Sequence, residues 1–144
     1  MDRCDHTKLA EHFEEVADIM FHLDTNGSYI VSETIFLFYS ALHYVDAYLS
    51  VFGSNDNDKH PQVHKNVRNQ NESRYHIMQR YFDLEALGNY ALLLQASHTS
   101  RYQRGFDLLT ARHKVVGPIH RDSHKKLKDK ILRAIAQNAP MPTP

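Results

Sequence analysis

Eleven of the 144 residues are histidine, and three basic residues recur at a spacing that could bind a phosphate. His60, His64 and Arg68 lie four positions apart, so on a helix they would share one face, with Lys59 and Lys65 beside them. Arginine offers a planar fork of donors, lysine a point charge, and imidazole a donor that becomes cationic near an anion. The pattern favours a phosphate or nucleotide site, and the alternative is a solvated polar face at the edge of a loop.

Two pairs of histidines have the spacing that lets both imidazoles reach one metal ion, namely His60 with His64 and His120 with His124. Neither pair carries the glutamate of the HExxH arrangement, and no carboxylate is fixed by spacing as a third ligand. His120 and His124 are therefore weak metal candidates. A solvated basic patch on a helix surface is the simpler interpretation of that segment.

Tyr39, His43 and Asp46 are polar residues within an otherwise apolar stretch, spaced four and three positions apart. On a helix they would lie together, where they could line a pocket or orient an imidazole for acid/base work. A satisfied hydrogen-bond network in the core is the commoner form of such a cluster.

Composition and motifs exclude several other classes of protein. The 17 Lys and Arg balance the 17 Asp and Glu, so the chain has no global basic field for non-specific binding to nucleic acid. Its single cysteine, Cys4, allows no internal disulfide, and no serine lies in a Gly-x-Ser-x-Gly turn. Gly-rich phosphate loops are absent as well, and we expect no cofactor.

The N-terminal sequence lacks the apolar core of a signal peptide, and we expect a cytoplasmic protein. A chain of this length with 42% hydrophobic residues suits one domain, which we place at residues 1–137, followed by a disordered tail at 138–144.

Apolar residues at spacings of three and four predict helices rather than strands. We expect an all-α fold, an up-and-down antiparallel bundle of four long helices plus a short one. The second helix is apolar around most of its circumference near its start, which is typical of a central helix. The expected helices cover 5–24, 32–52, 61–69, 74–96 and 106–135, the last kinked at Gly117 and Pro118, with a loop at 53–61 and a connection at 97–105.

The order of these segments resembles the HEPN superfamily. The run from Phe38 to Leu49, followed by Gly53 and then by residues 60–68, is similar to the second helix and following loop of that family. The segment Leu9 to Phe13 is similar to its first helix, and Ser100-Arg101-Tyr102 to the segment after its third helix. The resemblance covers most of the chain, in order.

The resemblance implies a cytosolic helical module, commonly a homodimer, that binds a nucleotide or RNA and partners a nucleotidyltransferase or belongs to a toxin-antitoxin or defence system. Ribonucleases of the family carry an arginine, four to six residues, then a histidine; here seven residues separate Arg68 from His76. We therefore expect a non-catalytic module, in which the polar edge of His43, Asp46, Lys59, His60, His64, Lys65 and Arg68 contacts a phosphate or a partner.

Three alternatives stay open. The first is a degenerate, metal-independent HEPN ribonuclease in which Arg68 holds phosphate and His64 or His76 acts as acid/base. The second is a metal-binding bundle of the DinB-like sort, which needs three converging ligands such as His43, His120 and His124. The third is a structural dimer without a ligand.

Overall fold

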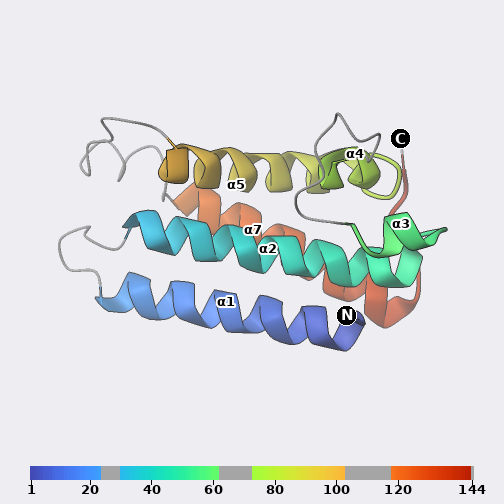
Figure 1. Ribbon diagram of the computed structural model, residues 1–144, viewed down its shortest axis with the longest axis horizontal. Helices are drawn as coiled ribbons and strands as arrows, with labels where there is room; N and C mark the ends of the chain where they lie inside the picture. The colour runs from blue at the N-terminus through green and yellow to red at the C-terminus, as the bar shows by residue number, and fades with distance from the viewer. Residues whose placement is uncertain (24–29, 62–72, 103–117, 144) are drawn as a thin grey trace.

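The computed structural model describes residues 1–23, 30–61, 73–102 and 118–143, and within these ranges the chain forms helices and no strand (Figure 1). The predicted all-α class is therefore confirmed. The helices are α1 (Arg3–Leu23), α2 (Ile30–Phe52), α3 (Asp56–Lys59), α4 (Arg74–Met78), α5 (Leu84–Tyr102) and α7 (Pro118–Gln137).

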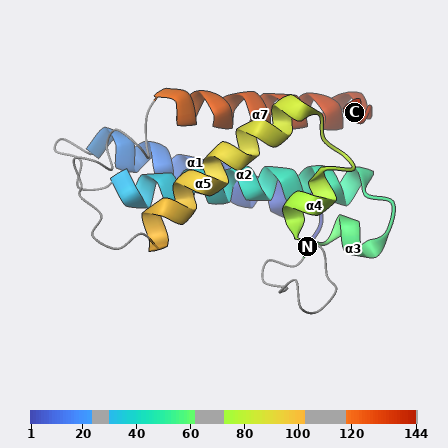
Figure 2. The ribbon, with the colours of Figure 1, turned by 90° about the horizontal axis from the view of Figure 1, so that it is seen from above.

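Helix α2 is central, as its apolar circumference predicts. It packs against α1, α5, α7 and α3, and Figure 2 shows α5 crossing it obliquely. Tyr44, Val45, Tyr48 and Leu49 of α2 are fully buried, so successive residues on different sides of the helix all find apolar neighbours. The core consists of α2 and the faces of the other helices that turn toward it.

The segment Ser32–Phe52 is long and apolar enough to cross a membrane by length and composition alone. In this fold, however, 61% of it is buried inside the protein. Because the surrounding helices already cover it, the hydropathy of α2 is explained by its place in the core.

The helix expected over 74–96 is wrong as a single element, because the chain turns between α4 and α5 at residues 79–83. Asp83 begins α5 by accepting a hydrogen bond from the backbone N–H of Ala86 at 2.9 Å. The turn is held from outside as well, since the Tyr48 hydroxyl donates to the carbonyl oxygen of Tyr81 at 3.0 Å. The apolar spacing persists across the turn, which is why the pattern suggested continuity.

The region expected as a loop at 53–61 contains the short helix α3. Asn55 caps it, its side chain accepting from the N–H of Asp58 at 2.9 Å. The buried Asp58 carboxylate then accepts from Arg80 at 2.8 Å and from the Tyr81 hydroxyl at 2.5 Å. Together these bonds fix α3 against the turn that precedes α5.

Three further boundaries differ from the predictions or cannot be compared. Helix α5 continues to Tyr102 through the start of the expected connection at 97–105. Helix α7 is described from Pro118 to Gln137, so it extends two residues beyond the expected end at 135. The expected helix at 61–69 and the expected kinked part at 106–117 lie outside the described residues, apart from Pro61.

The C-terminal segment differs from the disordered tail expected at 138–144. Met141 is only 6% exposed and joins the core, and its backbone N–H donates to the Tyr48 hydroxyl at 2.9 Å. Asn138 enables the reversal after α7 by adopting a positive φ of 47°, a conformation that asparagine tolerates better than most residues. Composition predicted fraying, but an apolar side chain and one hydrogen bond return the segment to the core.

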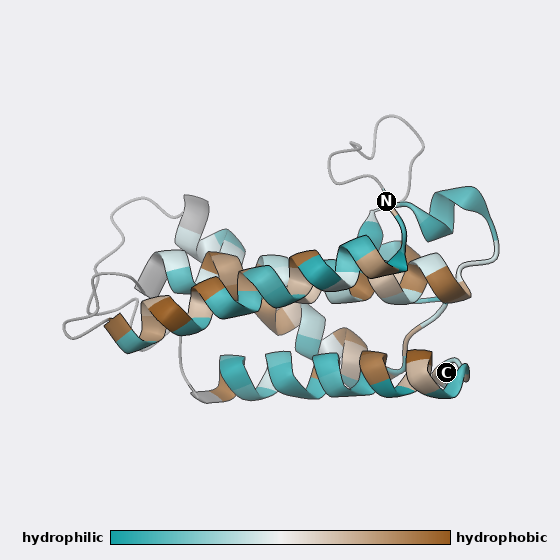
Figure 3. Ribbon diagram, turned by 90° about the horizontal axis from the view of Figure 1, so that it is seen from below, coloured by the Kyte–Doolittle hydropathy of each residue, from teal (hydrophilic) through white to brown (hydrophobic). Residues whose placement is uncertain are grey.

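Apolar side chains are exposed at the C-terminal end of α1, which is brown in Figure 3. Ile19, Phe21 and Leu23 are 51%, 49% and 64% exposed. Phe21 is partly covered by the guanidinium of Arg121, whose carbon lies 4.3 Å from the ring centroid.

Candidate functional site

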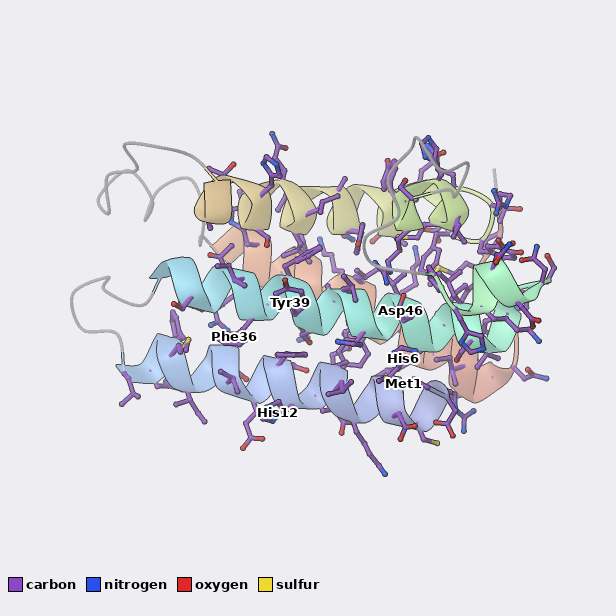
Figure 4. The ribbon with its side chains drawn as sticks, viewed as in Figure 1. Met1, His6, His12, Phe36, Tyr39 and Asp46 are labelled. Carbon is purple, nitrogen blue, oxygen red and sulfur yellow. The ribbon has the colours of Figure 1, made fainter. Side chains whose placement is uncertain are left out.

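The structure brings four ionisable side chains together at the end of the fold where α1 begins. We call His6 of α1, His43 and Asp46 of α2, and Arg74 of α4 the His-Asp-Arg cluster; Figure 4 labels His6 on α1 and Asp46 on the neighbouring α2. The Nδ1 atoms of His6 and His43 are 3.3 Å apart. Asp46 and Arg74 form a bidentate ion pair, with Nε–Oδ1 and Nη2–Oδ2 distances of 2.7 and 3.0 Å.

Helical spacing explains why these residues meet. His6 lies in phase with Ala10, Phe13 and Ala17, so it continues the face of α1 that packs on α2. The ring of Phe13 stacks on His43 at a centroid distance of 5.5 Å and an interplanar angle of 8°. The packing of α1 on α2 therefore sets the orientation of both imidazoles.

Burial decides the protonation of the cluster. It lowers the pKa of both His6 and His43, so both rings are neutral at neutral pH; the charge of Asp46 opposes this effect at His43. Burial raises the pKa of Asp46, but the adjacent Arg74 opposes it, and the bidentate geometry is that of an ionised carboxylate. Burial alone would lower the pKa of Arg74, but Asp46 outweighs it and raises the pKa.

Both halves of the ion pair are buried, which makes the pair expensive to break. The side chains of Arg74 and Asp46 are 7% and 5% exposed. Arg74 also donates to the carbonyl oxygen of Pro61 at 3.3 Å and bonds to the side chain of Tyr90. The guanidinium thus joins α2, α5 and the end of the segment that follows α3.

The predicted polar edge is brought together only in part. His43 and Asp46 belong to the His-Asp-Arg cluster, and Lys59 and His60 lie at the end of α3, where the charge of His60 acts on His6 and Asp46. His60 is exposed and Lys59 is half-buried. The other three members of the edge, His64, Lys65 and Arg68, lie outside the described residues.

Two other predicted positions lie at different places relative to this cluster. Tyr39 packs against Phe38 and against Phe13, whose ring also stacks on His43. His76 is exposed on α4, where its Nδ1 lies 2.9 Å from the Ser73 hydroxyl. Of the predicted Tyr-His-Asp cluster, His43 and Asp46 belong to the His-Asp-Arg cluster.

Sequence reasoning missed His6 and Arg74. The signal for His6 was available, since it continues the apolar phase of the first helix. Arg74 had no such signal, because it lies 28 residues from its carboxylate partner.

The interpretation of His120 and His124 as part of a solvated basic patch is wrong for His124. That ring is 4% exposed, and its Nε2 lies 2.9 Å from the hydroxyl of Ser40, which donates to the carbonyl oxygen of Ala10 at 2.8 Å. Burial lowers the pKa of His124 to about 4, so the ring is neutral. Burial also lowers the pKa of His120.

The structure also does not bring His43, His120 and His124 together as metal ligands. His124 faces Ser40 and Tyr44, whereas His43 faces His6. Among the described residues, the group of three potential ligands within reach of one ion is His6, His43 and Asp46.

A second polar region lies between α1, α2 and α7 beside a pocket of about 310 Å³. Lys128 pairs with Glu14 at 2.8 Å, and Arg121 pairs with both Asp18 and the buried Glu33. These ion pairs tie α7 to α1 and α2, although the buried Nε of Arg121 has no hydrogen-bond partner.

No family model, no curated protein and no solved structure matches this chain. The His-Asp-Arg cluster and the basic residues around it are the features of the chain that bear on its function.

Proposed function

We propose that this chain is a HEPN-like module, an up-and-down antiparallel helical bundle, that binds the phosphate of a nucleotide or of an RNA end without catalytic machinery of its own. We further propose that it acts in the cytoplasm as a homodimer, with a nucleotidyltransferase-like protein as partner. The phosphate would bind where α3 ends, at the edge of the His-Asp-Arg cluster.

One observation carries this proposal: Arg74 links the cluster to the start of the basic segment. It holds Asp46 through two hydrogen bonds and the Pro61 carbonyl oxygen through a third. Pro61 directly follows Lys59 and His60 and directly precedes the stretch of sequence that carries His64, Lys65 and Arg68. Pro61, which the basic residues follow in the sequence, is therefore held at the edge of the cluster.

The structure changes the part that Asp46 plays in this proposal. Both of its oxygens already accept from Arg74, and a carboxylate repels a phosphate, so it does not contact the ligand. Asp46 instead holds Arg74, while Lys59, His60 and the basic residues after Pro61 supply the donors. The charge of Asp46 is cancelled by Arg74, so Asp46 would not repel an anion held by the basic residues.

Thermal unfolding with ATP, GTP and short RNAs, all in EDTA, tests the proposal. A ligand at about 100 times its dissociation constant stabilises the folded state by roughly 2.7 kcal/mol, which raises the melting temperature of a domain of this size by roughly 5 to 15 °C. We expect a rise with at least one of these ligands that is lost in Arg68→Ala and reduced in His60→Ala.

Arg133→Ala is the matched control, because Arg133 is an exposed arginine on α7, outside the cluster. A rise that survives in Arg68→Ala, or is lost equally in the control, contradicts the proposed site. No rise with any of these ligands, in protein that melts cooperatively, contradicts phosphate binding itself. Turnover of RNA in EDTA that His64→Ala or His76→Ala abolishes would replace the proposal with the ribonuclease alternative.

A further inference from the structure

We propose that His6, His43 and Asp46 form a binding site for a divalent transition-metal ion of the zinc type. One ring nitrogen from each histidine and one carboxylate oxygen of Asp46 lie within 4.8 Å of one another. The three residues come from two helices that pack along their length, so the site is built by tertiary packing and not by a local turn.

The separation of the imidazoles fits direct coordination. Zinc binds imidazole nitrogens at about 2.0–2.1 Å, so two nitrogens at neighbouring corners of a tetrahedron lie about 3.3–3.4 Å apart. The Nδ1 atoms of His6 and His43 are 3.3 Å apart. An ion can therefore bridge the two rings without moving α1 relative to α2, whereas the carboxylate of Asp46 must approach by a side-chain adjustment.

The chemistry of the three ligands selects the class of metal. Two imidazoles and a carboxylate suit zinc, iron, nickel or copper, whereas magnesium and calcium prefer oxygen ligands throughout. Both rings are neutral, the state in which a ring nitrogen has a lone pair for a metal. Three protein ligands also leave a coordination position open, which is the arrangement of catalytic rather than of structural zinc sites.

Neighbouring residues orient the ligands as a metal site requires. Arg74 fixes the plane of the Asp46 carboxylate, and Phe13 stacks on the ring of His43. Without metal, one Nδ1–H donates to the other Nδ1 across the 3.3 Å contact. Binding then needs a change of tautomer, in which that proton appears on Nε2 of the same ring, together with the adjustment of the Asp46 side chain.

Arg74 also limits the affinity, because it draws electron density from the carboxylate and adds a positive charge near the ion. An anion in the open coordination position would offset this charge. The metal site is nevertheless separate from the proposed function, which is tested in EDTA, so either can fail without the other.

Zinc titration of the untagged, chelator-treated protein tests the site. Competition against a chromophoric chelator of known zinc affinity gives the stoichiometry and the dissociation constant. We expect one zinc ion per chain, and a loss of affinity of at least about 100-fold in both His6→Ala and His43→Ala, because removal of a group that merely orients a ligand already costs about 10- to 100-fold. His12→Ala removes an exposed imidazole from the same helix and should leave the affinity unchanged.

A second measurement uses the unaltered chain, so it does not depend on the folding of any variant. Long-range ¹H–¹⁵N spectra report each imidazole nitrogen, and stoichiometric zinc should shift Nδ1 of His6 and of His43 and hold their protons on Nε2. The proposal is overturned if the protein fails to compete with the chelator, if affinity survives in both cluster variants, or if zinc shifts only nitrogens of other histidines.

Discussion

The buried ring of His124 makes the stability of this protein depend on pH. In the folded chain its pKa is about 4, whereas an unfolded histidine titrates near its ordinary value of 6.5. Because the Ser40 hydroxyl donates to the Ala10 carbonyl oxygen, it accepts from the Nε2–H of His124, which fixes the neutral tautomer. Protonation of the ring would add a second N–H at Nδ1 and place a positive charge on a side chain that is buried among the helices.

Because the pKa of His124 is lower in the folded than in the unfolded chain, acid destabilises the folded state. Below pH 6.5 the unfolded chain binds a proton at His124 that the folded chain refuses until about pH 4, so stability falls as the pH falls through this window. Linkage over these two pKa values gives a loss of about 2 kcal/mol between about pH 7.5 and about pH 5, and of about 3 kcal/mol once both states are protonated.

Urea unfolding at these two pH values, for the wild type and for His124→Gln, measures the effect. Glutamine keeps an N–H donor for Ser40 but does not titrate, so the pH-dependent loss of stability should be about 2 kcal/mol smaller in the variant. The other histidines are present in both proteins, so their contributions to the pH dependence cancel when the loss of stability in the variant is subtracted from that in the wild type. The exposed His12 supplies the control, since His12→Gln should keep the wild-type pH dependence.

A difference between the two pH dependences of less than about 0.5 kcal/mol, with unchanged denaturant slopes, would refute the reasoning. So would a histidine titration by NMR in which His124 gains its proton near pH 6.5 in the folded protein. Either result would mean that water reaches the ring and that the contacts with Ser40 and Tyr44 do not exclude it.

Three further predictions concern the free energy of unfolding of variants, each measured by chemical denaturation. A Cβ at Gly53 would lie 2.7 Å from one backbone oxygen and 2.9 Å from a backbone nitrogen, so Gly53→Ala should destabilise the protein by about 1–3 kcal/mol. A Cβ at Gly88 would meet nothing within 4 Å, so Gly88→Ala should stabilise the protein by about 0.5–1 kcal/mol. Equal effects of the two substitutions would contradict the packing around α3. Asp46→Asn or Arg74→Met should each cost about 3–5 kcal/mol, and the double variant should cost clearly less than their sum; additive losses would show that the two residues do not pair. Met141→Ala should cost about 2 kcal/mol or more, and a cost near zero would mean that the C-terminal segment does not contribute to the core.

Periodicity predicted the long helices well because each must bury one face, and the central place of α2 followed from its apolar circumference. It failed between α4 and α5, since the apolar phase runs on through the turn at 79–83. That turn depends on Asp58 and Tyr48, which precede Tyr81 by 23 and 33 residues. Apolar periodicity depends only on the order of residues along the chain, so it cannot predict contacts between residues this far apart.

Some residues of the candidate site could also be predicted from helical spacing, and others could not. Spacing on one helix placed His43 near Asp46, because residues three apart on a helix are neighbours whatever surrounds them. It could not supply His6 and Arg74, which reach the cluster only because α1 and α4 pack where they do. Helical spacing also could not predict that His124 is buried. Its neighbours in the sequence are charged, whereas its neighbours in the fold are Ser40 and Tyr44.

Helix geometry is local, so the order of residues along the chain is enough to predict which side chains share a helix face. The pairing of Asp46 with Arg74, the contact between His6 and His43, and the neutrality of His124 depend on which faces meet when the helices pack. Burial and the charges of residues distant in sequence set protonation and ligand geometry, and both exist only in the packed fold.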